Sequence, residues 1–136
     1  MRNFNTIVQI IFATIGGYMG WFLGGVDGFL YALIAFVVID YITGLMVAVL
    51  QKKLSSEIGF KGIFKKILIF LLVGVGNIVD NYLIKNGSAI RTAVIFFYIS
   101  NEGISILENS ARIGLPIPQK LKEILMQLNK EEDIND

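Results

Sequence analysis

Long apolar stretches separated by short polar ones dominate the sequence. The hydrocarbon core of a bilayer is about 30 Å thick, and roughly 20 mostly apolar helical residues cross it. Stretches of about this length occur at residues 6–25, 28–50, 67–84 and 89–107. The pattern predicts an all-α integral membrane protein with four transmembrane helices, or three if one of the end stretches does not cross.

The second and fourth stretches differ in how readily they should enter lipid. Residues 29–50 contain 13 Leu, Ile, Val or Phe, which sum to roughly −6 kcal/mol of insertion free energy against about +3 kcal/mol for Asp40. The fourth stretch has nine such residues, about −4 kcal/mol, which Asn101 and Glu102 roughly cancel. We therefore expect the second stretch to insert alone and the fourth to need neighbouring helices.

Two amphipathic segments border these stretches. Apolar residues recur at helical spacing from Phe60 to Ile67, with lysines between them. This pattern is typical of a helix that lies on the inner membrane surface, and it fits the start of the third span equally well. Residues 119–129 predict a second amphipathic helix, which follows a turn containing both prolines of the chain. We therefore predict a transmembrane domain over residues 1–110 and a cytoplasmic tail over residues 111–136.

The composition excludes most classes of enzyme. The chain is 54% hydrophobic and contains neither cysteine nor histidine, so it lacks thiolate chemistry, the commonest general base near neutral pH and the commonest metal ligand. We expect no enzyme activity, no metal site and no cofactor. The basic residues lack the interleaved aromatic residues of a nucleic-acid surface, so no nucleic-acid partner is expected.

The distribution of basic residues predicts the orientation in the membrane. The linker at residues 51–66 has Glu57 as its one acidic residue. Its basic residues are Lys52, Lys53, Lys61, Lys65 and Lys66. Four more basic residues follow the last span, against Lys85 and Arg91 in the opposite loop. For four spans, the positive-inside rule places both termini and this linker in the cytoplasm.

Small residues recur near the first connection. Gly16, Gly20, Gly24 and Gly28 lie four residues apart, and on one helix this spacing would clear a face for close approach of a second helix. Such approach is a main route to helix association in lipid. The spacing therefore predicts a helix-packing or self-assembly face, although turn glycines between the first two spans account for some of it.

Polar and ionisable residues occur inside three of the predicted spans. Ionisable groups in hydrocarbon cost several kcal/mol unless they meet water or a partner. Their polar faces therefore either line a wet pathway or form interhelical contacts, such as Asp40 or Asp80 with Arg91. The candidate pore-lining or interhelical residues are Asp40, Asn77, Asp80, Asn81, Asn101, Glu102, Ser105, Glu108 and Asn109.

Four blocks of the sequence carry a family resemblance. The blocks are Asp40-Tyr-Ile-Thr43-Gly44, residues 53–66 with Lys53-Leu-Ser55-Ser56 and two glycines, residues 96–109, and the turn Gly114-Leu115-Pro116-Ile117-Pro118. They resemble the toxin-secretion/phage-lysis holin family of low-GC Gram-positive bacteria and their phages. The last two blocks are the most specific, because they combine a polar-rich span with a Gly-x-Pro-x-Pro stop.

The resemblance implies a small multi-pass protein of the bacterial cytoplasmic membrane that causes host cell lysis or toxin secretion. Such a protein self-associates at a set time into a pore, through which a cell-wall hydrolase (endolysin) or a large toxin leaves the cell. The implied partners are further copies of the chain, the lipid bilayer and the released cargo, with no catalysis and no cofactor. A non-conducting membrane partner, such as an antiholin or a membrane anchor, is the alternative.

Overall fold

The computed structural model describes the backbone of residues 2–135 and the side chains of residues 3–128. Helices and short connections account for this whole part of the chain, and it contains no strand. The elements are α1 (Arg2–Phe22), α2 (Gly28–Leu50), α3 (Ser56–Ile78), a π-helical turn η1 (Val79–Ile84), α4 (Ala89–Ile113) and α5 (Gln119–Asn135). The all-α fold class predicted from the sequence is confirmed.

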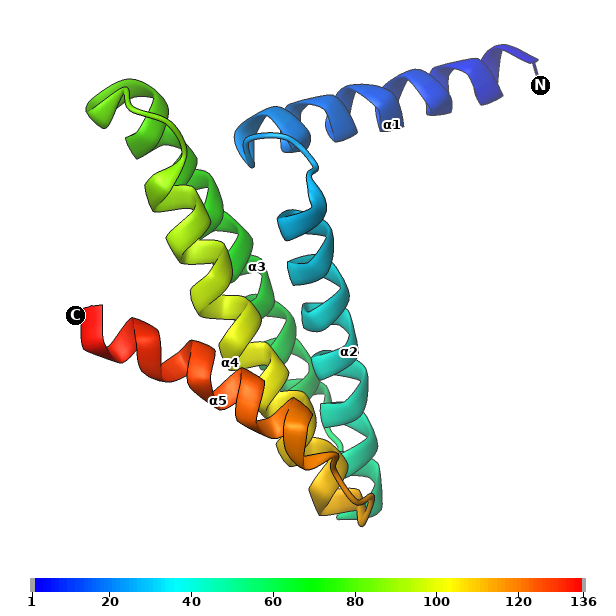
Figure 1. Ribbon diagram of the computed structural model, residues 1–136. Coiled ribbons are helices and arrows are strands. Elements are labelled where there is room, and N and C mark those ends of the chain that lie inside the picture. The colour runs from blue at the N-terminus through cyan, green and yellow to red at the C-terminus, as the bar shows by residue number, and fades with distance from the viewer. Residues whose placement is uncertain (1, 136) are drawn as a thin grey trace.

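Three helices form an antiparallel bundle. Figure 1 shows α2, α3 and α4 along one another, with α1 projecting sideways from one end of α2 and α5 folding back beside α4 from the other end. Leu30, Leu33, Val73 and Ile95 are fully enclosed at the centre. We call the end that carries the α2–α3 and α4–α5 connections the linker end.

Three helices in the described part are long and apolar enough to cross a membrane. These helices are Gly28–Leu50, Ser56–Ile84 and Ala89–Ile113. The predicted span at residues 6–25 is not among them; it forms α1, whose Asn, Gln, Thr and Gly residues dilute its apolar content. The structure therefore favours the three-span alternative.

Helix α3 begins well before the predicted start of the third span at residue 67. Ser55 caps it, because its Oγ accepts a hydrogen bond from the backbone N–H of Ile58 at 3.2 Å. The amphipathic segment from Phe60 to Ile67 is consequently the start of α3 and not a separate surface helix. Lys66 therefore belongs to a span, and not to the linker in which the sequence placed it.

Helices α4 and α5 also extend beyond their predicted limits of residues 107 and 129. Gly114, with φ of 101°, ends α4 in the left-handed conformation that glycine adopts without strain. The chain then reverses, and Leu125 of α5 is buried against Gly103 of α4, where an added Cβ would lie 2.9 Å from its Cδ2 atom. The predicted tail therefore packs on the bundle.

The four glycines spaced by four residues do not share a helix. Helix α1 ends at Phe22, so Gly24 lies in the turn and Gly28 begins α2. Gly24 has φ of 86°, and an added Cβ would lie 2.6 Å from Nε of Arg91, so the turn itself requires glycine there. Gly24 and Gly28 are therefore the turn glycines that the sequence also allowed, while Gly16 and Gly20 on α1 face open space.

The end of α1 is held by the ring of Phe22, which lies over Gly74 of α3. An added Cβ on Gly74 would lie 2.0 Å from two ring atoms of Phe22. We expect Gly74→Ala to displace this ring and lower the free energy of unfolding by about 1–3 kcal/mol, as overpacking does. Detergent-solubilised protein, unfolded by heat and followed by circular dichroism, provides the measurement.

Gly17→Ala is the matched control, because nothing lies within 4 Å of the added Cβ. Alanine is intrinsically favoured over glycine inside a helix by about 1 kcal/mol, so this control should be neutral or stabilising. A shift of the same sign and size in both variants would contradict the contact between Phe22 and Gly74.

Candidate functional site

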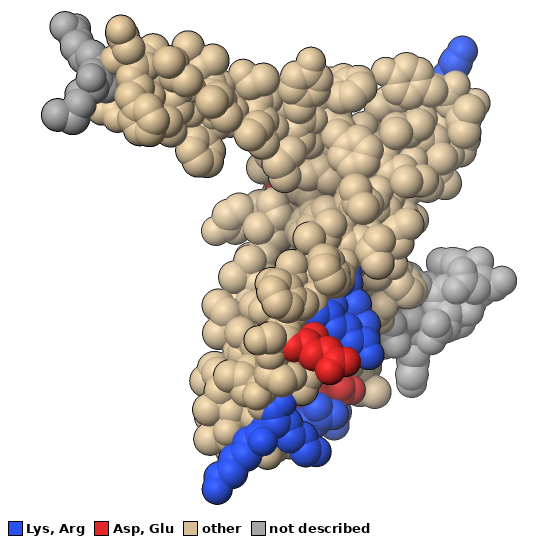
Figure 2. All heavy atoms as spheres, turned by 180° about the vertical axis from the view of Figure 1, so that it is seen from behind, with Lys and Arg blue, Asp and Glu red and all other residues tan. Residues whose placement is uncertain are grey.

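Charged side chains gather toward one end of the bundle. Figure 2 shows Lys, Arg, Asp and Glu over the lower part of the back face, near the linker end, and an almost uncharged surface above. Two polar sites lie inside the bundle. The first, which we call the charge cluster, consists of Asp40, Lys66 and Glu102, and the second lies toward the opposite end.

The charge cluster joins all three spans. Nζ of Lys66 on α3 donates to a carboxylate oxygen of Asp40 on α2 and, at 2.5 Å, to Oε2 of Glu102 on α4. Both carboxylates are buried and the Lys66 side chain is largely so. Because a buried charge is tolerated only with a partner, this ammonium holds three helices in one register.

Neighbouring polar side chains complete the coordination of Asp40. Nδ2 of Asn109 lies 3.0 Å from Oδ1 of Asp40 and 3.0 Å from Oγ1 of Thr43. Ser105 lines the adjoining cavity of about 210 Å³, together with Asp40 and Lys66. A water molecule occupies about 30 Å³ of liquid, so the cavity has room for several waters beside the charges.

Glycine residues let α3 approach α2 closely beside this cluster. An added Cβ on Gly62 would lie 3.1 Å from a ring carbon of Tyr41, and Gly59 accepts a hydrogen bond at its carbonyl from the Tyr41 hydroxyl at 3.3 Å. These two glycines belong to one of the blocks that resemble the holin family. Their place in the fold is the contact between α2 and α3 that positions Lys66.

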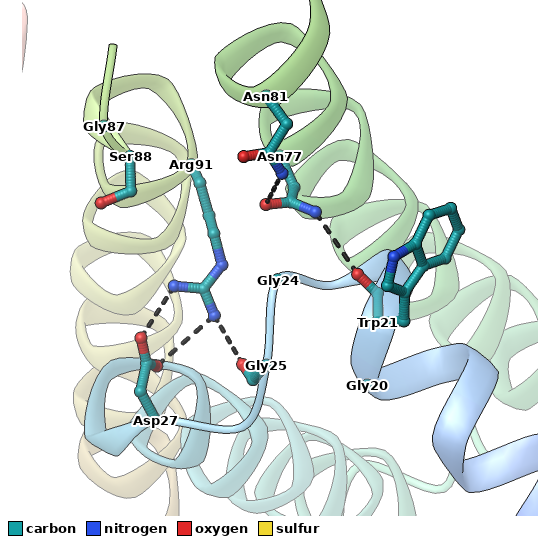
Figure 3. Close-up of a pocket in the computed structure, with 10 residues that line it drawn as sticks. All are labelled: Gly20, Trp21, Gly24, Gly25, Asp27, Asn77, Asn81, Gly87, Ser88 and Arg91. Carbon is teal, nitrogen blue, oxygen red and sulfur yellow. Dashed lines mark hydrogen bonds and ion pairs between the residues drawn. The ribbon is translucent and has the colours of Figure 1, made fainter. Parts of the chain in front are cut away.

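The second site, the arginine clamp, consists of Arg91 and its partners in the α1–α2 turn. Arg91 is 4% exposed; its Nε donates to the carbonyl of Leu23 at 2.5 Å and its Nη2 to that of Gly25 at 2.8 Å. Nη1 forms an ion pair with Asp27 at 2.8 Å. Figure 3 shows the guanidinium reaching from α4 into this turn. A planar guanidinium serves several acceptors at once, so one residue fixes the turn.

Asp27 sits at the rim of the clamp. The hydrogen bond from Arg91, together with that from the backbone N–H of Leu30, holds the pKa of the Asp27 carboxyl below its ordinary value. The depressed pKa means that its contribution to folding is complete at neutral pH and is lost as the pH falls through the folded-state pKa. The sequence analysis did not identify Asp27, although its place as the N-cap of α2 was a usable signal.

Asp80 caps α4. Its carboxylate accepts hydrogen bonds from the backbone N–H groups of Ile90 at 3.0 Å and Arg91 at 2.8 Å. A negative charge is stabilised at a helix N-terminus. The predicted pairing of Asp80 with Arg91 is therefore made through the Arg91 backbone, while the predicted pairing of Asp40 with Arg91 is wrong because Asp40 binds Lys66.

Two asparagines tie the end of α1 to α3. Nδ2 of Asn77 donates to the carbonyl of Phe22 at 3.2 Å and more weakly to that of Trp21 at 3.4 Å. Asn81 donates to Asn77 at 3.0 Å. These side chains line a cavity of about 570 Å³ beside the arginine clamp (Figure 3).

Asn101 and Glu108 remain without such contacts. Within the described part of the chain, neither side chain has a hydrogen-bond or ion-pair partner. Asn101 is half-buried near the middle of α4, and Glu108 is exposed nearer the linker end. Ser105 follows Asn101 by four residues and precedes Glu108 by three, so all three side chains lie on one face of α4.

Most of the predicted polar residues are thus bonded within the chain, and Asn101 and Glu108 are the two without a partner among the described side chains. Each of the carboxylates Asp40, Asp80 and Glu102 has a partner within one chain. For these three carboxylates, the structure forms interhelical contacts, one of the two possibilities that the sequence left open. Among the described side chains, no group of three or more acidic residues is placed to hold a metal ion.

The charge cluster makes a direct prediction for stability. Lys66→Met leaves two carboxylates without their cation, and breaking a buried pair costs roughly 3–5 kcal/mol. We expect this loss of unfolding free energy in a denaturant titration of the detergent-solubilised protein. Adding Asp40→Asn and Glu102→Gln should restore much of the loss, because both unpaired charges are then removed.

Lys65→Met is the matched control, because Lys65 is adjacent in sequence but exposed. Its effect should stay within about 0.5 kcal/mol. Equal losses in the two lysine variants, or no recovery in the triple variant, would show that the ammonium of Lys66 does not hold the spans together.

Comparisons with known proteins agree with this architecture. A model of the bacteriophage holin family matches residues 17–130. An uncharacterized 14.9 kDa protein of Clostridium perfringens is 40% identical over 97% of this chain and 100% of its own length. An uncharacterized protein of Listeria innocua is 42% identical over 88% of this chain and 85% of its own length.

One named relative carries a function in its name. A probable holin of Bacillus phage phi105 is 37% identical over 112 residues, 82% of this chain and 82% of its own. No solved structure is significantly similar to the chain. The family match covers most of the chain and includes both polar sites, so the chain belongs to the bacteriophage holin family and is a multi-pass membrane protein, not an enzyme.

Proposed function

We propose that this protein self-assembles in the bacterial cytoplasmic membrane into a lesion that releases a cell-wall hydrolase or a large toxin. The family match and the named phage relative support a holin-like role. The observation that carries self-assembly is the unpartnered Asn101 near the middle of a transmembrane helix.

Asn101 lies at the middle of α4, a helix that is long and apolar enough to cross a membrane. Its side chain is half-buried and has no hydrogen-bond partner among the described side chains. A polar side chain within a transmembrane helix gains about 0.6–2 kcal/mol from a hydrogen bond to another helix. A second copy of the chain supplies such a partner without disturbing the bonded sites inside each monomer.

The polar face of α4 also offers a lining for the lesion. Asn101, Ser105 and Glu108 share one face, and Glu102 of the charge cluster and Asn109, which donates to Asp40, lie next to it on the same helix. In an assembly, this sector can turn from its neighbours toward water. The cavity beside the cluster gives water a starting point.

The orientation proposed for the bundle places the linker end in the cytoplasm. Lys52, Lys53, Lys61 and Lys65 are all exposed at this end, and basic residues are retained on the cytoplasmic side. With three spans, the opposite end and α1 then lie outside the cytoplasm. The placement of both termini in the cytoplasm would require a fourth span.

The internally paired carboxylates favour one alternative function. A chain that satisfies Asp40, Asp80 and Glu102 by itself can persist as a monomer. Such a monomer suits a non-conducting partner, such as an antiholin or a membrane anchor. Purified protein in liposomes distinguishes the two, because only the lesion-forming protein releases a trapped dye.

Asn101→Leu tests the assembly step. Loss of 0.6–2 kcal/mol for each contact between copies weakens association by about threefold to thirtyfold. We expect dye release to require correspondingly more protein per lipid, and lysis in a bacterial host to be delayed, while the amount of inserted protein stays the same. Crosslinking in the same liposomes reports the oligomer population.

Ile104→Leu is the matched control, since it keeps the volume of a neighbouring side chain on the same helix and removes no hydrogen bond. Its release curve should coincide with that of the unsubstituted protein. Identical curves for the Asn101 variant would remove the role of this amide. No release by the unsubstituted protein at any protein-to-lipid ratio would favour the non-conducting partner.

A further inference from the structure

Helix α1 exposes apolar side chains along its whole length and carries no charged residue between positions 3 and 22. Its exposed large apolar residues are Phe4, Ile7, Ile10, Ile11, Phe12, Ile15, Tyr18, Met19 and Trp21. Figure 1 shows that α1 leaves the bundle at the start of α2 and projects sideways from it. A surface of this size and composition needs a cover.

The attachment of α1 shows which way its faces point. The ring of Phe22 lies over Gly74 of α3, whereas Gly20 and Trp21 line the cavity with Asn81. Helix α3 runs from the linker end, so Gly74 lies deeper in the bundle than Asn81 in the following turn η1. The face of α1 that carries Phe22 therefore points toward the middle of the bundle, and the face that carries Gly20 points outward.

The helical period assigns the remaining residues to these two faces. Phe4, Ile11 and Ile15 precede Phe22 by 18, 11 and 7 residues, multiples of a helical turn that align them with it. Asn5, Gln9 and Gly16 precede Gly20 by 15, 11 and 4 residues, which are also close to whole numbers of helical turns, so they lie on the same face as Gly20. The apolar face thus points toward the level of the spans and the polar face away from it.

The depth of α1 follows from the lengths of the spans. Helix α2 has 23 residues and is about 35 Å long, slightly more than a hydrocarbon core of about 30 Å. Its first residue directly follows the turn held by Arg91. The arginine clamp therefore fixes the end of α1 at the level where α2 leaves the hydrocarbon.

We infer that α1 lies flat in the lipid headgroup boundary of the leaflet opposite the linker end, with its apolar face in the acyl chains. The partner is the lipid surface itself. Because α1 is uncharged between positions 3 and 22, its binding comes from apolar burial and not from anionic lipids. The N-terminus then lies on the opposite side of the membrane from the α4–α5 connection.

Tryptophan depth tests this position in the full-length protein, because Trp21 is its one tryptophan. In a Trp21→Phe background, a single tryptophan is returned at Ile11, at Gln9 or at Val38, an exposed residue near the middle of α2. Each variant is reconstituted in phosphatidylcholine vesicles that contain lipids with a quencher near the headgroup or near the acyl-chain end.

We expect the tryptophan at position 11 to be quenched about twofold more strongly by the shallow label than by the deep one, and the one at position 38 to show the reverse. Aqueous iodide should quench the tryptophan at position 9 and spare that at position 38. Replacing part of the phosphatidylcholine by phosphatidylglycerol should leave these ratios unchanged.

A transmembrane α1 would give a different result, because positions 9 and 11 would lie at the same depth, near the bilayer centre, and match position 38. That result overturns the inference, as does iodide quenching of both positions without any effect of labelled lipid. Dye release by the same vesicles is a separate readout, so failure of the proposed lesion and failure of the α1 position are distinguishable.

Discussion

The ammonium of Lys66 between the carboxylates of Asp40 and Glu102 is the interaction on which the bundle depends. Each of the three spans contributes one charged group to it. A charged side chain inside a membrane raises the free energy unless it has a partner of opposite charge or contacts water. If one span moved away from the other two, at least one of these charged groups would lose its partner. The glycines of α3 that admit Tyr41 allow the approach that this pairing requires.

The arginine clamp performs the corresponding task at the opposite end. It joins the first turn of α4 to the turn between α1 and α2. Asp80 accepts hydrogen bonds from the backbone N–H groups of Ile90 and Arg91 in that first turn of α4. Both ends of the bundle are therefore bonded within one chain. Under the proposed function, assembly then begins from polar groups that the monomer leaves unpaired, such as Asn101, and not from the charges that the fold has already satisfied.

The sequence by itself determined the class of protein and most of its helices. Hydrophobic stretches of span length predict the all-α membrane fold, and α2 has the same bounds as the stretch at residues 28–50. The turn at Gly114 to Pro118 could be predicted from the sequence because proline and glycine end helices through their effect on the local backbone conformation. The family resemblance, confirmed by the family match, also rested on contiguous residues.

Only the tertiary structure decided which charges pair and how α1 is placed. The sequence predicts Lys66 to be part of a basic linker, but α3 begins at its cap Ser55 and therefore includes Lys66. The two partners of Lys66 are 26 and 36 residues away in sequence. Arg91 and Asp27 are 64 residues apart in sequence. The regular spacing of the glycines continues past Phe22, where α1 ends, and the spacing alone does not show that end. Periodicity shows which face of a helix is polar, but the partner of that face is set by the packing of helices that are distant in sequence.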